Sequence, residues 1–132
     1  MDNKFKEPEA LTSVAKFHDT FGMPIVENPS IPDKKRCQLR VSLLQEELNE
    51  LKEALDTNDL IETADALADL QYVLSGAILE FGLADSFKDI FDEVQRSNMS
   101  KTCKSMEEAE ATQAHYLKNK DTESFIKQKG EE

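Results

Sequence analysis

Acidic residues recur at helical spacing within one apolar segment of the 132-residue chain. Glu62, Asp65 and Asp69 fall in a sector of about 60° when residues 60–81 are drawn as a helix. The rest of the segment is mostly leucine, isoleucine, valine and alanine, so we expect the acids to face a cleft or the interior. Burying unpaired carboxylates is costly, and the segment contains no lysine or arginine. The acids therefore need a cation from elsewhere.

A second acidic group lies upstream, in the sequence EELNELKEA. Glu47 and Glu50 border the apolar sector of a helix predicted over residues 33–55, whereas Glu46 and Glu53 point further toward solvent. The two helices would present carboxylates to each other without histidine or thiolate, and such hard ligands favour Mg²⁺ or Mn²⁺ over Zn²⁺. The alternative is a solvated acidic face, the usual role of glutamate runs. Confinement of the acids to one stripe favours the metal site.

Charge and composition narrow the class of protein. The 16 lysines and arginines are outnumbered by 27 aspartates and glutamates, and a formal net charge of −11 argues against a nucleic-acid-binding protein. No apolar run approaches the roughly 18 residues of a membrane span and no signal peptide is visible, so we expect a cytoplasmic protein without membrane partners. The two cysteines and two histidines form no metal-binding motif, which leaves the chemistry to the carboxylates.

The distribution of prolines is typical of a helical protein, because no proline occurs between Asp33 and Asn119. We predict an all-α fold, a helical bundle of four to five helices completed by oligomerisation, in a single domain over residues 1–132. Its core spans about 8–104, and 105–132 form a charged, partly flexible extension. The predicted helices cover 8–21, 33–55, 60–81, a segment around 87–94 that ends at 97–101, and 105–116.

Residues at the predicted helix ends support these boundaries. Asp59 and its neighbours supply capping groups for the third helix, and Gly82 is placed as its stop. Asp85 and Ser86 offer a cap for the fourth helix, and Ser105 could open the fifth through a capping box. The third helix is apolar on almost every side, which predicts a central position in the bundle.

Several segments resemble, in the same order, those of the MazG-like all-α nucleoside triphosphate pyrophosphohydrolases, whose relatives include phosphoribosyl-ATP pyrophosphohydrolase and the dimeric dUTPases. Glu47-x-x-Glu50 followed by Glu62-x-x-Asp65 resembles the paired acidic motif of this superfamily. The resemblance covers about residues 10–101. The segments are FHDTFGMP at 17–24, EELNELKEAL at 46–55, DALADLQYVLSGA at 65–77 and RSNMSK at 96–101.

The resemblance implies a Mg²⁺ site, with Mn²⁺ as a substitute. Its ligands would be Glu47, Glu50, Glu62 and Asp65, and Asp69 is an alternate because it directly precedes the apolar run LQYVL. The resemblance also implies homodimers or dimer-of-dimer tetramers. Glu46 or Glu47 would be the catalytic base, and Arg96, Asn98 and Lys101 would contact the substrate, with the Lys34–Arg36 group and Arg40 as further cations.

The implied reaction is metal-dependent hydrolysis of a nucleoside triphosphate between the α and β phosphates, giving the monophosphate and pyrophosphate. Two alternatives stay open: a phosphoribosyl-ATP pyrophosphohydrolase of histidine synthesis, and a non-catalytic helical interaction module. Phe17, His18 and Tyr72 are candidates for a nucleobase pocket, although aromatic residues and histidines at helical spacing usually belong to a core.

Overall fold

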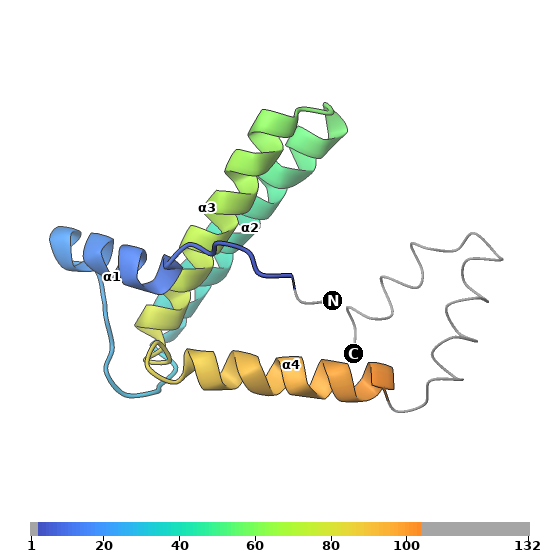
Figure 1. Ribbon diagram of the computed structural model, residues 1–132. Coiled ribbons are helices and arrows are strands. Elements are labelled where there is room, and N and C mark those ends of the chain that lie inside the picture. Colours follow the sequence, from blue (N-terminus) through green and yellow to red (C-terminus); the bar gives the residue numbers. More distant parts are fainter. Residues whose placement is uncertain (1–2, 104–132) are drawn as a thin grey trace. The chain divides into compact units, whose positions relative to one another are not determined.

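The computed structural model describes residues 3–103, which contain helices and no strand. The helices are α1 (Ala10–Phe21), α2 (Lys34–Asp56), α3 (Leu60–Glu80) and α4 (Phe87–Cys103) (Figure 1). The all-α prediction is confirmed. The chain divides into two compact units, one ending at Lys88 and one beginning at Asp89, and each is described by itself. Among the helices of residues 3–103, none combines the length and apolar content needed to cross a membrane.

Local chemistry sets the helix boundaries. Asp33 and Asp59 are N-caps: each side chain accepts a hydrogen bond from the backbone N–H three residues later, at 2.9 and 3.0 Å. Gly22 follows α1 with φ of 67°, and Gly82 follows α3 with φ of 71°, a left-handed conformation that favours glycine. The predicted cap at Asp59 and the predicted stop at Gly82 are thereby confirmed.

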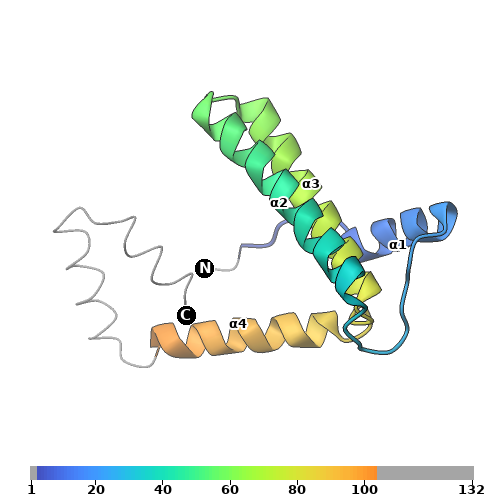
Figure 2. The same cartoon turned by 180° about the vertical axis from the view of Figure 1, so that it is seen from behind.

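The first unit is built on a hairpin of α2 and α3, which run antiparallel along their whole length (Figures 1 and 2). Helix α1 lies against the C-terminal half of α3, so α3 is the central helix, as its apolar sequence predicts. The buried apolar side chains are few and mostly small, which lets the helices approach closely. They are Val14, Ala54, Ala66, Ala77, Ile78 and Leu79.

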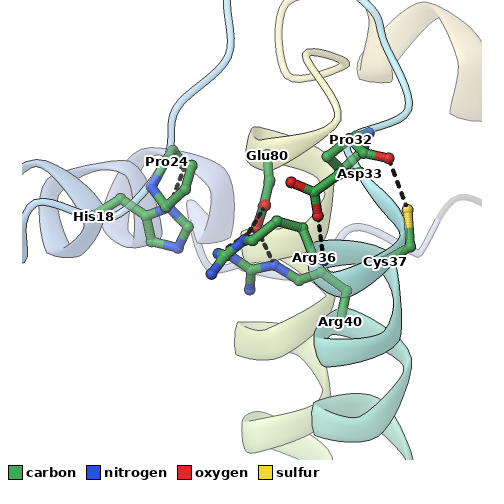
Figure 3. A network of polar contacts seen from close by, with 8 residues as sticks. All are labelled: His18, Pro24, Pro32, Asp33, Arg36, Cys37, Arg40 and Glu80. Atoms are coloured by element: carbon green, nitrogen blue, oxygen red, sulfur yellow. Dashed lines mark hydrogen bonds and ion pairs between the residues drawn. The ribbon is translucent and has the colours of Figure 1, made fainter.

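A buried ion cluster ties the start of α2 to the end of α3. The carboxylate of Glu80, only 2% exposed, accepts hydrogen bonds from Nε and Nη2 of Arg36 at 2.6 and 2.8 Å (Figure 3). It also accepts one from Nε of Arg40 at 2.6 Å. The hydrogen bonds from Arg36 and Arg40 lower the pKa of Glu80 to about 2, against the opposing effect of burial. Glu80 is therefore a charged group whose burial depends on two arginines.

Helix α1 joins this cluster through a buried histidine. Nδ1 of His18 donates to the carbonyl oxygen of Pro24 at 2.7 Å, because a carbonyl can only accept (Figure 3). Its Nε2 faces Gly76 of α3, where a Cβ atom would lie 3.2 Å from this nitrogen and 2.8 Å from Nη1 of Arg40. A glycine at this position lets the imidazole and the guanidinium both pack on the α3 backbone.

The connector between α1 and α2 docks on the end of α3. The backbone N–H groups of Val26 and Ser30 donate to the carbonyls of Leu79 and Phe81 at 3.0 and 2.9 Å. These bonds satisfy carbonyls that the last turn of a helix leaves without an intrahelical partner. The connector therefore brings the start of α2 back to the end of α3, where the ion cluster forms.

The second unit contains most of α4, and here one prediction is wrong. Residues 97–101 were expected to leave the helix, but α4 continues through them to Cys103. The segment holds serine and asparagine but no glycine or proline, and such residues lower helix stability without ending a helix. The predicted fifth helix over 105–116 and the extension over 105–132 lie outside the described residues.

Replacing Gly76 by alanine tests the close packing around the ion cluster. The added Cβ would overlap Nη1 of Arg40, so Gly76→Ala should lower the free energy of unfolding by about 1–3 kcal/mol, although alanine is the better helix former. Chemical denaturation measures the change. In an Arg40→Ala background the same substitution should cost less, and an equal loss in both backgrounds would contradict this account.

Candidate metal centre

Three carboxylates from α2 and α3 meet in the hairpin. One oxygen from each of Glu47, Glu50 and Asp69 lies within 4.8 Å of the other two. Glu47 and Glu50 are one turn apart on the face of α2 that meets α3, and Asp69 lies opposite them on the stripe predicted from the sequence. The antiparallel pairing of two helices is thus what assembles the group, which we call the acidic cluster.

Burial and close spacing raise the pKa values of carboxyl groups in the acidic cluster. Burial, and after it hydrogen bonding with Glu50 and repulsion from Glu50, Asp69 and Glu46, raises the pKa of Glu47 to about 7. The pKa of Asp69 is also raised, first by burial and then by repulsion from Asp65 and Glu50. Oε2 of Glu47 is buried and has no hydrogen-bond partner. A buried acceptor left without a donor is what a missing cation would leave behind.

A cavity of about 330 Å³ adjoins the acidic cluster near the turn of the hairpin. Glu50 and Glu53 of α2 and Glu62 and Asp65 of α3 line it, together with Ala54, Thr57 and Ala66. The side chains of the two alanines and the threonine are small, which leaves room for a ligand beside the carboxylates. Glu62 and Asp65 are exposed on this wall and face the cavity, in keeping with the expectation that the α3 stripe faces a cleft or the interior.

The donor set fits a hard divalent cation. An octahedral Mg²⁺ with bonds of about 2.1 Å places neighbouring ligand atoms about 3 Å apart and opposite ones about 4.2 Å apart. The separations within the acidic cluster, at most 4.8 Å, are close to this range. All three donors are carboxylate oxygens, which suit Mg²⁺ and Mn²⁺ better than softer metals.

The structure distributes the five predicted metal ligands over two neighbouring places. Asp69, the alternate in the sequence analysis, joins Glu47 and Glu50, whereas Glu62 and Asp65 line the adjoining cavity. Asp65 lies close enough to Asp69 to raise its pKa through charge repulsion and a hydrogen bond. Which of these acids bind a metal therefore stays a prediction.

The other predicted site residues lie in different surroundings. Glu46 is exposed beside Glu47 on α2, and Tyr72 follows Asp69 by one turn, with its ring 5.7 Å from that of Phe17. Arg96, Asn98 and Lys101 belong to α4 in the second unit, and Arg96 there pairs with Glu93. Their roles in substrate binding stay predictions.

Two of the predicted cations are committed elsewhere. Arg36 and Arg40 were expected to assist phosphate binding, but both bind Glu80, and the side chain of Arg40 is only 4% exposed. Glu80 itself was missed by the sequence analysis. Its signal was an acid at the end of an apolar stretch, where burial demands a partner, with two arginines available near the start of the preceding helix.

Comparison with known proteins places the chain in a family. Residues 14–98 match the family described as phosphoribosyl-ATP pyrophosphohydrolase. The chain belongs to this family. The family is part of the MazG-like all-α nucleoside triphosphate pyrophosphohydrolases, so the resemblance stated from the sequence is confirmed. The family is named for a pyrophosphohydrolase, and its enzymes typically depend on a metal ion.

The chain also resembles a viral protein, "Uncharacterized protein L479" of Acanthamoeba polyphaga mimivirus. The two are 31% identical over 98 residues. The match covers 67% of this chain but only 37% of the viral protein, so the chain spans little more than a third of that relative's length. The similarity thus concerns one part of a larger protein.

The raised pKa of Glu47 predicts a pH-dependent gain from removing its charge. When folding raises the pKa of a carboxyl, the folded protein becomes less stable as the pH rises from the ordinary pKa of that carboxyl toward its raised value, here about 7. In a chelator, Glu47→Gln should therefore be more stable than the parent by roughly 1 kcal/mol at pH 8 and about equal to it at pH 4. Thermal unfolding across this range measures the difference. Glu27→Gln, on the exposed connector, is the control, and a gain independent of pH would contradict the prediction.

Proposed function

We propose that this protein is a Mg²⁺-dependent nucleoside triphosphate pyrophosphohydrolase that cleaves between the α and β phosphates. The observation that carries the proposal is the acidic cluster beside an acidic cavity, within a chain of a pyrophosphohydrolase family. Glu47, Glu50 and Asp69 would hold the metal, with Asp65 and Glu62 completing the set from the cavity wall. Mn²⁺ would serve in place of Mg²⁺ because the donors are the same hard oxygens.

The acidic site requires the cation for substrate binding as well as for chemistry. Carboxylates and a triphosphate repel each other, so the acidic cluster alone would exclude the substrate. When bound, Mg²⁺ supplies charge neutralisation of the phosphates and a water of lowered pKa. Loss of the proton from Glu47 would accompany cation binding, since the ligand must be a carboxylate.

Residues around the acidic cluster supply the remaining roles. Glu46, exposed next to Glu47 on α2, is our candidate for the base that orients the attacking water, with Glu47 as the alternative. Tyr72 (42% exposed) and Phe17 (39% exposed) would contact the nucleobase one turn from Asp69. His18 is excluded from this role because it is buried and bonded to Pro24. Arg96, Asn98 and Lys101 are our candidates for phosphate contacts.

A second substrate deserves testing because of the family match. Phosphoribosyl-ATP carries the same triphosphate and would use the same metal ligands, and it is the substrate in the description of the matching family. It differs by an additional phosphoribosyl group on the base, which requires a further anion-binding contact. The two substrates are thus distinguished by the pocket around the base and not by the acidic cluster.

We further propose that the active unit is a homodimer, from which a tetramer could form. Large apolar side chains stand exposed along the α2–α3 hairpin, more than a soluble monomer ordinarily presents. A second copy with two-fold symmetry would cover them. They include Val41 (66% exposed), Leu48 (49%), Leu55 (59%), Leu60 (81%), Ile61 (80%) and Leu67 (53%).

If the protein is a dimer, its mass in solution should be twice that of the chain, and a charge on the apolar surface should lower that mass. Light scattering should give about twice the 14.9 kDa of the chain, and Leu48→Lys should shift the population toward monomer because it places a charge on the apolar surface. Ser13→Lys, on the exposed surface of α1 and away from this hairpin surface, serves as the matched control. A monomeric parent with full activity would contradict the proposal.

A panel of canonical and modified nucleoside triphosphates, with phosphoribosyl-ATP, tests the reaction. We expect pyrophosphate and the monophosphate as products, only with Mg²⁺ or Mn²⁺, and ¹⁸O from labelled water in the monophosphate. Glu50→Gln and Asp69→Asn should each lower kcat/KM by roughly a hundredfold or more while the protein stays folded, because each removes a metal ligand. Orthophosphate as the product, or no turnover of any substrate with either metal, would overturn the proposal.

A further inference from the structure

The ion cluster and the acidic cluster occupy equivalent positions on the two long helices. Arg36 precedes Glu47 by eleven residues on α2, and Glu80 follows Asp69 by eleven residues on α3. Eleven residues make about three turns, a rise of about 16 Å, and return to nearly the same helix face. Because α2 and α3 are antiparallel, the Arg36–Glu80 pair and the Glu47–Asp69 pair belong to one register.

The acidic cluster cannot hold this register by itself. Ligand oxygens of its three carboxylates lie within 4.8 Å of one another and like charges at this distance repel, so in the absence of a cation they favour separation of the helices. A slip by one helical turn would move Asp69 by about 5.4 Å relative to Glu47, more than the 4.8 Å that now contains the ligand atoms. The buried side chains of the hairpin near the acidic cluster, Ala54 and Ala66, are too small to oppose such a slip strongly.

The ion cluster, unlike the acidic cluster, can hold α2 and α3 in one register because its charges attract. Its three hydrogen bonds, of 2.6 to 2.8 Å, join opposite charges in a fixed geometry, and Glu80 is almost completely buried. A displaced α2 would leave that carboxylate buried without its partners, which is strongly unfavourable. Directional polar contacts of this kind can fix the register of paired helices, at some expense in stability.

We propose that Glu80, through Arg36 and Arg40, is a positioning residue that sets the register of α2 on α3 and so holds Glu47 and Glu50 beside Asp69. The proposal rests on the proposed function for its consequence, which is metal binding. The register itself can be measured without a metal and without activity.

The first arm of the test measures register by chemical cross-linking. Glu47→Cys and Asp69→Cys are combined with Cys37→Ser and Cys103→Ser, and the rate of cross-linking by a short bifunctional methanethiosulfonate is followed in a chelator. Adding Glu80→Gln should slow cross-linking several-fold. Glu93→Gln, which removes a glutamate from the exposed Glu93–Arg96 pair, is the matched control and should leave the rate unchanged.

A triple variant separates positioning from stability. Arg36→Leu with Arg40→Met and Glu80→Leu replaces the buried ions by apolar side chains, which commonly preserves or raises stability but removes the directional bonds. We expect a melting temperature near or above that of the parent, yet slow cross-linking. The triple variant also tests whether the ion cluster sets the register if Glu80→Gln fails to fold. Cross-linking at the parent rate in the stable triple variant would overturn the proposal.

The second arm links register to the metal. In the chain with its native acids, the triple variant should bind Mn²⁺ about tenfold more weakly than the parent, measured by electron paramagnetic resonance of free Mn²⁺. Unchanged affinity would also overturn the proposal. A parent that binds no Mn²⁺ would instead refute the proposed function, and the cross-linking arm would still report on the register.

Discussion

Repulsion between carboxylates is the constraint on which this structure depends. Two long helices bring Glu47, Glu50 and Asp69 together with ligand atoms within 4.8 Å, in a hairpin whose second helix carries no basic residue. Burial is the largest cause that raises the pKa of Glu47 to about 7, and hydrogen bonding with Glu50 and repulsion from the neighbouring acids add to it. Holding these carboxylates together destabilises the folded protein at this site. A divalent cation bound by the acidic cluster would offset that loss of stability.

The rest of the first unit opposes that repulsion. The connector docks on the end of α3 and returns the chain to the start of α2, where Arg36 and Arg40 bind Glu80. Gly76 leaves the space in which Arg40 and the buried His18 pack on α3. Attraction between opposite charges at one end of the hairpin thus offsets repulsion between like charges nearer the other.

Helical periodicity and capping residues were sufficient to predict the helices over residues 10–80, because Asp59 and Gly82 act locally. The same periodicity placed Asp69 on the correct stripe but could not decide between Asp69 and Asp65 as the partner of Glu47. That choice depends on the axial register of two helices, which no local pattern encodes. The role of Arg40 was missed for the same reason: its partner Glu80 lies 40 residues away in the chain.

Paramagnetic broadening by Mn²⁺ in the NMR spectrum of the ¹⁵N-labelled protein tests the central claim most directly. At substoichiometric Mn²⁺, amide signals of residues 46–51 and 65–70 should lose intensity first, whereas those of residues 34–37, about 15 Å or more along α2, should persist. The pattern should disappear on addition of excess Mg²⁺, which competes for the same oxygens. Broadening centred elsewhere, or a spectrum unaffected by Mn²⁺, would contradict a metal centre in the acidic cluster.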